Sequence, residues 1–320
     1  MGSEGVRVSV IYIHLRTRHL LRSVDVVSSI ARMIRTNRLR LVLLISLGLV
    51  MLPMMGCSSD SGEEPTATLR ILVTNDDGVE APGIDAVVEA LITDENNDVV
   101  VSAPAVNQSS SGDNTTPTPP PLEAMQTTTA SGYPATAVMG YPADSVLYAL
   151  QNLYPDAPPH VVLSGINAGQ NVGNVKIGGS ELGLQVDISG TIGAAKTAAC
   201  SGVPALASSQ GDGETADYPS GVAEVLRWLE ANRAALLAGN VSTETITNIN
   251  IPSCDTGTIR GQLEVPLASG NPSGWNLPDG FQDCESTVEN PPDDIEAFFN
   301  GYVTITPVPS NSSHTCDGLN

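Results

Sequence analysis

The sequence predicts an α/β protein with three layers, α/β/α, in a Rossmann-like arrangement on a mostly parallel sheet, with a β-rich elaboration at the C-terminal end. Two patterns predict this fold. Short apolar runs end in turn residues, as buried parallel strands do, and they alternate with stretches whose apolar residues recur at helical spacing. The region from Leu69 to Pro309 is long enough for one domain of this kind.

The first predicted strand is the apolar run Ile71–Val73, which Asn75, Asp76, Asp77 and Gly78 terminate. In open α/β sheets, ligands bind outside the carboxyl ends of the strands. Two adjacent carboxylates at such an end favour a hard divalent cation. The alternative is an ordinary turn, because Asp-Asp-Gly is a common turn sequence.

A helix and a second strand are predicted to complete a β-α-β unit. The helix stripe runs over Ile84–Leu91 and the strand over Asp98–Ala103. The following loop, Asn107–Gly112, offers serine hydroxyls and backbone N–H groups to an ion or phosphate, although any flexible loop has a similar composition. The proline-rich segment Thr115–Pro121 is expected to be extended and exposed.

A second polar segment follows a later strand. The elements that lead to it are a strand over Ala135–Met139, a helix over Pro142–Leu153 and a strand over His160–Leu163. The segment Ser164–Asn171 then combines small residues with the side chains of Asn167 and Asn171. Small residues allow a ligand to approach the backbone, and amide oxygens can bind a cation.

The third polar segment is the start of a predicted helix at Ser189–Lys196, capped by Ser189 or Thr191. A helix N-terminus presents free N–H groups and the positive end of the helix dipole, which together form an anion site. The alternative for this segment, as for the previous one, is a tight turn, here leading into a closely packed Ala/Gly helix.

The rest of the chain is predicted to complete the domain. The expected elements are a strand over Pro204–Ser208, a structural helix over Gly221–Leu237 and two half-exposed strands over Ile246–Ile251 and Tyr302–Thr306. Pro252–Asn300 is rich in Gly, Pro, Asp and Asn, and its composition fits either a long loop or an arm that forms oligomers.

The N-terminal region resembles an export signal. Three arginines between residues 35 and 40 precede the apolar run Leu41–Met55, and Gly56 and Cys57 follow it. We expect residues 1–57 to form a lipoprotein signal with Cys57 as the lipidated residue, residues 58–68 to form a tether, and the protein to reside in the cell envelope, in the periplasm or on the outer surface. The alternatives are a soluble periplasmic protein with an ordinary signal peptide and an uncleaved anchor. Met33 is a better start for this signal than Met1, so residues 1–32 are candidates for an untranslated extension.

Charge and cysteine usage limit the partners and the chemistry. Eight of the 14 Lys and Arg residues precede Cys57, so the remainder carries 33 acidic residues against six basic ones and is not expected to bind nucleic acid. Cys200, Cys254, Cys284 and Cys316 can form up to two disulfides in an oxidising compartment, with three possible pairings. Cys200 alternatively fits a buried thiol.

Taken together, the motifs resemble a known family. ILVTNDDGVEAPGI, SAPAVNQSSSG, GYPADSV, VVLSGINAGQNVG, SGTIGAA and GVPALA stand in this order and are followed by NINIP and GYVTITP. They are similar to the motifs of the SurE (survival protein E) family of nucleotidases and acid phosphatases. The resemblance covers residues 69–308 and leaves 309–320 as a tail. It implies a three-layer fold, metal-dependent phosphomonoesterase activity and a homodimer or homotetramer.

The resemblance also implies roles for individual residues. The metal ligands fall on Asp76, Asp77, Ser109 and Asn167, and the phosphate-binding groups fall on Asn171, Ser189, Gly190 and Thr191. The expected substrate is a nucleoside 5′- or 3′-monophosphate. Oxygen ligands favour Mg²⁺ or Mn²⁺, with Ca²⁺ also compatible. Asp76 or Asp77 is expected to orient or deprotonate the attacking water.

Three alternatives to this function can be compared with the sequence. A Ser-His-Asp hydrolase is disfavoured, because the part after Cys57 contains only His160 and His314 and no G-x-S-x-G motif. A lipoprotein that binds metal or nucleotide without turnover would use the same ligands. A broad acid phosphatase or polyphosphatase would also use the same metal site and differ only in its loops.

Overall fold

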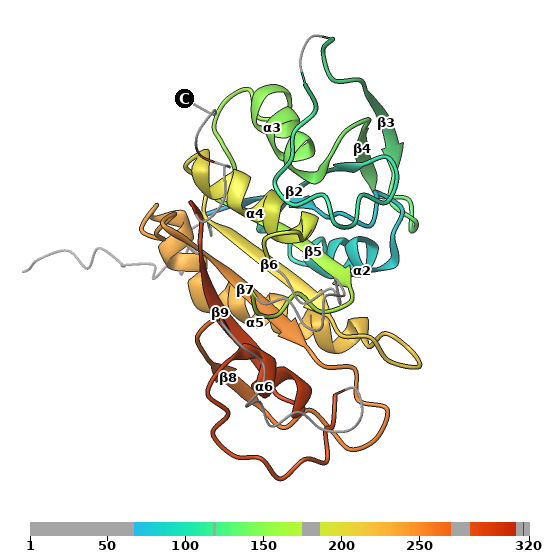
Figure 1. The fold of residues 1–320 in the computed structure, drawn as a ribbon. Helices are drawn as coiled ribbons and strands as arrows, with labels where there is room; N and C mark the ends of the chain where they lie inside the picture. The colour runs from blue at the N-terminus through green and yellow to red at the C-terminus, as the bar shows by residue number, and fades with distance from the viewer. Residues whose placement is uncertain (1–66, 118–119, 175–185, 270–281, 312–315, 317–320) are drawn as a thin grey trace, which may run out of the picture. The chain divides into compact units, whose positions relative to one another are not determined.

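The computed structural model describes residues 67–117, 120–174, 186–269, 282–311 and 316. These residues form a nine-stranded sheet with the order β3-β4-β2-β1-β5-β6-β7-β9-β8 (Figure 1). The six neighbouring strands β4, β2, β1, β5, β6 and β7 are parallel to one another. β3 is antiparallel to β4, β9 is antiparallel to β7, and β8 is parallel to β9. The mostly parallel α/β sheet predicted from the sequence is confirmed.

The strands lie close to the predicted positions. Their bounds are β1 (Leu69–Thr74), β2 (Asn97–Pro104), β3 (Ala124–Thr128), β4 (Pro134–Val138), β5 (Val161–Ala168), β6 (Ala205–Gln210), β7 (Thr245–Ile251), β8 (Gln262–Glu264) and β9 (Val303–Pro309). In β1, Ile71 and Val73 belong to one hydrophobic cluster and Leu72 to another. Both faces of the strand are therefore covered, which explains its continuous apolar run.

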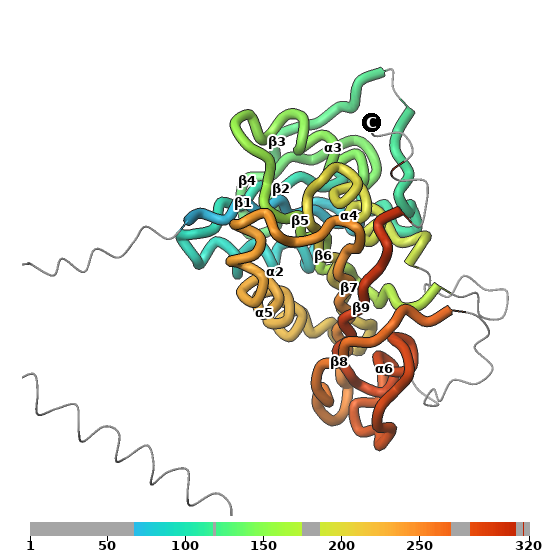
Figure 2. The backbone as a smooth tube through the Cα atoms, turned by 90° about the vertical axis from the view of Figure 1, so that its left-hand side faces the viewer, coloured from blue at the N-terminus to red at the C-terminus, as the bar shows by residue number. Residues whose placement is uncertain are grey.

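Two pairs of helices cover the two faces of the sheet. α2 (Pro82–Leu91) and α5 (Tyr218–Leu237) pack on one face, and α3 (Pro142–Asn152) and α4 (Gly190–Cys200) pack on the other (Figures 1 and 2). α2 buries the predicted stripe of Ile84, Val87, Val88 and Leu91. In α4, every residue from Gly190 to Ala199 is buried, because its small side chains let it pack closely against both α3 and the sheet.

Three elements had no recognised sequence signal. β3 is an edge strand with an exposed Met125, so it lacks the apolar run of a buried strand. β8 spans three residues, and α6 (Asp294–Phe299) spans six within the segment whose composition fitted a loop or an arm. Elements this short show too few residues for a periodic pattern to be visible.

The expectation that β7 and β9 are half-exposed is wrong. Asn248 and Asn250 of β7 and Thr304 and Thr306 of β9 are fully buried. The polar residues that alternate along β7 face an interior that is polar at this point, because both asparagines donate hydrogen bonds to the carbonyl oxygen of Asn171. In β7 the alternation of polar and apolar residues therefore reflects two buried faces, one polar and one apolar, and not one buried and one exposed face.

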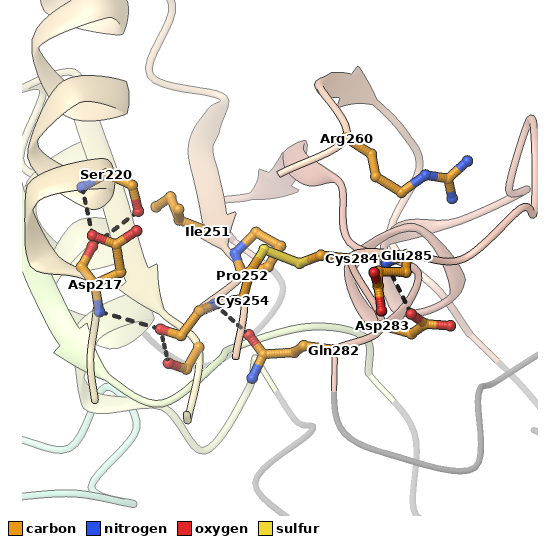
Figure 3. The surroundings of a disulfide bond; sticks show 12 residues. Asp217, Ser220, Ile251, Pro252, Cys254, Arg260, Gln282, Asp283, Cys284 and Glu285 are labelled. Atoms are coloured by element: carbon orange, nitrogen blue, oxygen red, sulfur yellow. Dashed lines mark hydrogen bonds between the residues drawn. A yellow bond between two sulfur atoms is a disulfide. The ribbon is translucent and has the colours of Figure 1, made fainter. Parts of the chain in front are cut away.

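Both pairs of cysteines in the domain form disulfides, Cys200–Cys316 and Cys254–Cys284. The alternative of a buried free thiol at Cys200 is wrong, because Cys316 of the C-terminal tail lies next to it. The Cys254–Cys284 bond fastens the segment after β7 to the segment before α6 (Figure 3). No helix within the described ranges is long and apolar enough to cross a membrane. The predicted signal, Cys57 and residues 58–66 of the predicted tether lie outside these ranges.

Candidate functional site

The site is built around the turn that follows β1. Asn75 shapes this turn, because its Nδ2 donates to the carbonyl oxygen of Gly78 at 2.8 Å and its Oδ1 accepts from the Gly78 amide at 3.2 Å. The turn places Asp76 and Asp77 at the carboxyl end of the strand, as predicted. Asp76 is almost completely buried, whereas Asp77 is half-buried.

Asp76 is held by the N-terminus of α4. The hydroxyl of Thr191 donates to Asp76 Oδ1 at 2.6 Å. Burial raises the pKa of Asp76, and hydrogen bonds from the Thr191 hydroxyl and from the backbone N–H groups of Thr191 and Gly190 oppose that rise. The start of α4 therefore binds the Asp76 carboxylate of the protein itself, and the role of Ser189, Gly190 and Thr191 in phosphate binding stays a prediction.

Asp77 is held by the strand end next to β1 and by the loop after β2. Its Oδ2 accepts from the amide of Ala168 at 2.9 Å, and its Oδ1 accepts from Asn107 Nδ2 at 3.2 Å. Burial raises the pKa of Asp77 to about 6 despite the Ala168 hydrogen bond, and the neighbouring Asp76 carboxylate adds to the rise. Two carboxylates this close to each other form a strongly electronegative point that a cation would stabilise.

The loop containing Ser109 is tied to the same turn. The amide of Gln108 donates to the carbonyl oxygen of Asp76 at 2.7 Å, and the amide of Ser109 donates to Asn107 Oδ1 at 3.0 Å. Ser109 is exposed, so its hydroxyl is open to a ligand. Ser110 has a φ of 64°, which turns the chain sharply directly after Ser109.

Asn167 lies within β5, which extends to Ala168, five residues beyond the predicted end at Leu163. The register between β5 and β6 shifts between Ser164 and Asn167. The Asn167 side chain is 8% exposed, and its Nδ2 donates to the carbonyl oxygen of Gly169 at 2.6 Å. This hydrogen bond leaves the amide oxygen of Asn167 as its ligand atom, one residue from the amide that binds Asp77.

Asn171 is fixed by the two strands beyond β5. Its amide donates to Asn250 Oδ1 at 2.6 Å, and its own Nδ2 donates to Ser209 Oγ at 2.9 Å. Ser209 pairs with Asn167 in the β5–β6 register. The structure therefore places Asn171 one strand further along the sheet than Asn167, where its position is set by buried polar partners.

Ser111 is the site residue that the sequence reasoning missed. A Cβ atom added at Gly190 would lie 2.7 Å from Ser111 Oγ and 3.0 Å from Asp76 Oδ2, so the Ser111 hydroxyl and the Asp76 carboxylate both contact the start of α4. Ser111 Oγ is buried and has no hydrogen-bond partner among the residues that the structure describes. The Ser-Ser-Ser run was a visible signal, but the sequence does not show which of its hydroxyls faces the carboxylates.

The segments that carry the predicted ligands therefore lie at one edge of the sheet. Asp76 and Asp77 follow β1, the Ser109 loop after β2 is hydrogen-bonded to the carbonyl oxygen of Asp76, and Ala168, next to Asn167 in β5, is hydrogen-bonded to Asp77. The described residues contain no group of three or more His, Cys, Asp or Glu side chains arranged around a common point. Two adjacent carboxylates with neutral oxygens in the neighbouring loops are the kind of groups that bind a hard cation, and they lie beside the N-terminus of α4.

A family model described as survival protein SurE matches residues 71–269, the region that contains all of these groups. The chain belongs to the SurE family. The 5′-nucleotidase SurE of Parvibaculum lavamentivorans is 34% identical over 281 residues, covering 80% of this chain and 91% of that protein. The 5′-nucleotidase SurE of Paramagnetospirillum magneticum is 32% identical, covering 78% and 94%.

The fold of this SurE family member also has a solved counterpart. The crystal structure of the SurE protein from Aquifex aeolicus matches it with a TM-score of 0.57 and 28% sequence identity, covering 76% of this chain and 94% of that chain. The SurE resemblance found from the sequence motifs is therefore confirmed at the level of family and fold.

Proposed function

We propose that this protein is a metal-dependent phosphomonoesterase that hydrolyses nucleoside 5′- or 3′-monophosphates to nucleoside and phosphate. The relatives that cover most of the chain are named 5′-nucleotidases, which supports this substrate class. The observation that supports the proposal is that hydrogen bonds tie the Asp76-Asp77 turn both to Ala168, the neighbour of Asn167 in β5, and to the loop of Ser109.

The residues present fit a divalent cation. Asp76, Asp77, Ser109 and Asn167 would hold it, since all four supply hard oxygen donors, and Mg²⁺ or Mn²⁺ suits such a set, with Ca²⁺ as a further candidate. The described residues Thr191, Ala168 and Asn107, which hydrogen-bond to these two carboxylates, are not basic, so such an ion would stabilise the paired negative charges. When bound, the ion supplies Lewis-acid polarisation of a phosphoryl oxygen and lowers the pKa of water.

The two carboxylates differ in what they can do. Asp76 is enclosed by the start of α4, so its part is to hold its position and charge. Asp77 lies partly open to a neighbouring cavity, and this exposure favours Asp77 as the group that orients or deprotonates the attacking water. Its two hydrogen bonds, from Ala168 and Asn107, fix the direction of the carboxylate.

The proposed phosphate-binding groups are the Ser111 hydroxyl, the start of α4 and Asn171. The buried hydroxyl of Ser111, which has no partner within the described part of the chain, can donate to a phosphoryl oxygen beside Gly190. The dipole of α4 adds positive potential at Ser189, Gly190 and Thr191. Asn171 completes this set as a residue that is held rigidly near the same edge.

Cell location and assembly are proposed from the sequence alone. The apolar run that ends at Gly56 and Cys57 favours export and a lipid anchor on Cys57. A compartment outside the cytoplasm also suits two disulfides. The family resemblance favours a homodimer or homotetramer.

A phosphomonoester panel tests the function. The protein is assayed for release of inorganic phosphate from nucleoside 5′- and 3′-monophosphates and from glycerol phosphate, with Mg²⁺ or Mn²⁺ and with EDTA. We expect metal-dependent release that EDTA abolishes and that Asp77→Asn lowers at least about 100-fold, because the fixed carboxylate is lost. Glu89→Gln, which alters an exposed carboxylate on α2, is the matched control and should keep full activity. If the wild-type protein releases no phosphate from any monoester, the proposal is wrong and a binding role is favoured.

A further inference from the structure

A cavity of about 390 Å³ opens directly beside Asp77. Three parts of the chain form its walls: the turn and first residues of α2, the loop after β2, and the start of α5. Asp77, Asn107 and Ala168 line it as well, so the cavity begins where the two hydrogen bonds hold the Asp77 carboxylate. A volume of this size is within the range of small-molecule sites.

The chemistry of the walls is selective. Val79, Ala81, Pro82 and Val106 give an apolar surface, and Tyr218 is the aromatic residue among those that line the cavity. Among the described residues that line it, the charged ones are Asp77 and Glu80, and none is Lys or Arg. An apolar wall with one aromatic ring suits a flat, uncharged group, whereas two carboxylates disfavour a second phosphate.

We propose that this cavity binds the leaving group of the substrate and that Tyr218 stacks on the aromatic base of a nucleoside. The inference rests on the proposed function and deepens it, because it assigns the nucleoside side of the site. It also separates nucleoside monophosphates from chains of phosphates, which would place further negative charge between Asp77 and Glu80.

Tyr218 is held in place for such a role. It is the first residue of α5, whose cap is Asp217. The amide of Asp217 donates to Ser253 Oγ at 3.3 Å, and Ser253 precedes Cys254 of the disulfide, so the start of α5 is fastened to the Cys254–Cys284 segment (Figure 3). Because the start of α5 is fastened, the backbone that carries Tyr218 loses little conformational freedom when a base stacks on the ring.

A second hollow lies on the other side of Val106. Its volume is about 320 Å³, and its walls include Val138, Met139 and Tyr141, while Ala105 and Val106 are shared with the first cavity. Neither Asp76 nor Asp77 lines this second hollow. Since Asp77 lines the first cavity and not the second, the first cavity is the better site for a group attached to the reacting phosphate.

The test compares two substrates and one inhibitor. For Tyr218→Ala we expect kcat/KM for adenosine 5′-monophosphate to fall at least about ten-fold, as the loss of one base–aromatic stack predicts, while kcat/KM for glycerol phosphate stays within about two-fold. Tyr218→Phe keeps the ring and should remain close to wild type on both substrates. Adenosine should inhibit glycerol phosphate hydrolysis competitively, and its inhibition constant should be at least about ten-fold higher in Tyr218→Ala. The inhibition constant of inorganic phosphate should be the same in the variant and the wild type.

Met139→Ala is the matched control in the second hollow and should leave all these values unchanged. A loss of nucleotide turnover in Met139→Ala but not in Tyr218→Ala would place the base on the other side of Val106 and overturn the inference. An equal fall in kcat/KM for both substrates in Tyr218→Ala would also overturn the inference. So would hydrolysis of tripolyphosphate by the wild-type protein as fast as hydrolysis of the nucleotide. A wild-type protein that hydrolyses no phosphomonoester would instead remove the proposed function, and the inference with it.

Discussion

At the scale of single residues, the position of Asp76 depends on the absence of a side chain at Gly190. A Cβ there would lie 2.7 Å from the Asp76 Cβ, closer than packed carbons allow. We therefore expect Gly190→Ala to displace Asp76 or Ser111 and to lower kcat/KM for nucleoside monophosphates at least about ten-fold, with a loss of unfolding free energy of about 1–3 kcal/mol. Steady-state kinetics with saturating metal, together with denaturant unfolding, measure both effects.

Gly202→Ala, just beyond the other end of α4, is the control for this variant. A Cβ at Gly202 meets no atom within 4 Å, although its φ of 83° makes the backbone strained with a side chain. This variant should lose stability without losing activity. Full activity in Gly190→Ala would contradict the view that close contact between α4 and Asp76 sets the geometry of the site.

At the scale of elements, the C-terminal part of the chain supports the site through buried polar contacts. β7 holds Asn171 through Asn248 and Asn250, and α6 holds the next turn, because Asp294 Oδ2 accepts from the amide of Gly173 at 2.8 Å. Asp294 Oδ1 accepts from the amide of Ala268 at 2.7 Å. The elaboration after β7 therefore stabilises the polar segment that follows β5.

Asp294 makes this support dependent on pH. Burial raises the pKa of the Asp294 carboxyl to about 6, against the hydrogen bonds from the Gly173 and Ala268 amides. Because the pKa in the folded state is higher than in the unfolded state, the folded state binds more protons between about pH 4 and 6, and the contribution of this group to stability falls as the pH rises through that window. The wild type should lose up to about 3 kcal/mol of unfolding free energy between pH 4 and 7 relative to Asp294→Asn, which does not titrate.

Denaturant unfolding of both proteins at several pH values measures this difference. The comparison with Asp294→Asn cancels the titration of the many other carboxylates, which both proteins share. Parallel stability curves for the two proteins would show that Asp294 is ionised at the same pH in the folded and unfolded states, contrary to this prediction.

At the scale of the whole molecule, local sequence patterns predicted the parallel sheet and the strand end that carries Asp76 and Asp77, whereas the strand that holds Asn167 runs five residues beyond its predicted end. These features depend on neighbours in the chain, so apolar runs and turn residues reveal them. The partners of the polar segments were not predictable in this way. Asn171 and Asn250 are 79 residues apart, and the cavity beside Asp77 is formed only when the start of α5 packs near the loop after β2.

The acidity of the protein also belongs to this scale. The part after Cys57 carries 33 acidic and six basic residues, yet the proposed substrate is an anion. Similar charges repel each other over a distance that salt shortens, from about 30 Å at 0.01 M to about 8 Å at 0.15 M ionic strength. With the metal kept saturating, we expect kcat/KM for nucleoside monophosphates to rise about two- to three-fold as NaCl increases over this range, because screening weakens the repulsion of the substrate. Sucrose at matched osmolality should produce no such rise. A decrease with NaCl would instead show that positive potential at the metal and the start of α4 dominates the approach of the substrate.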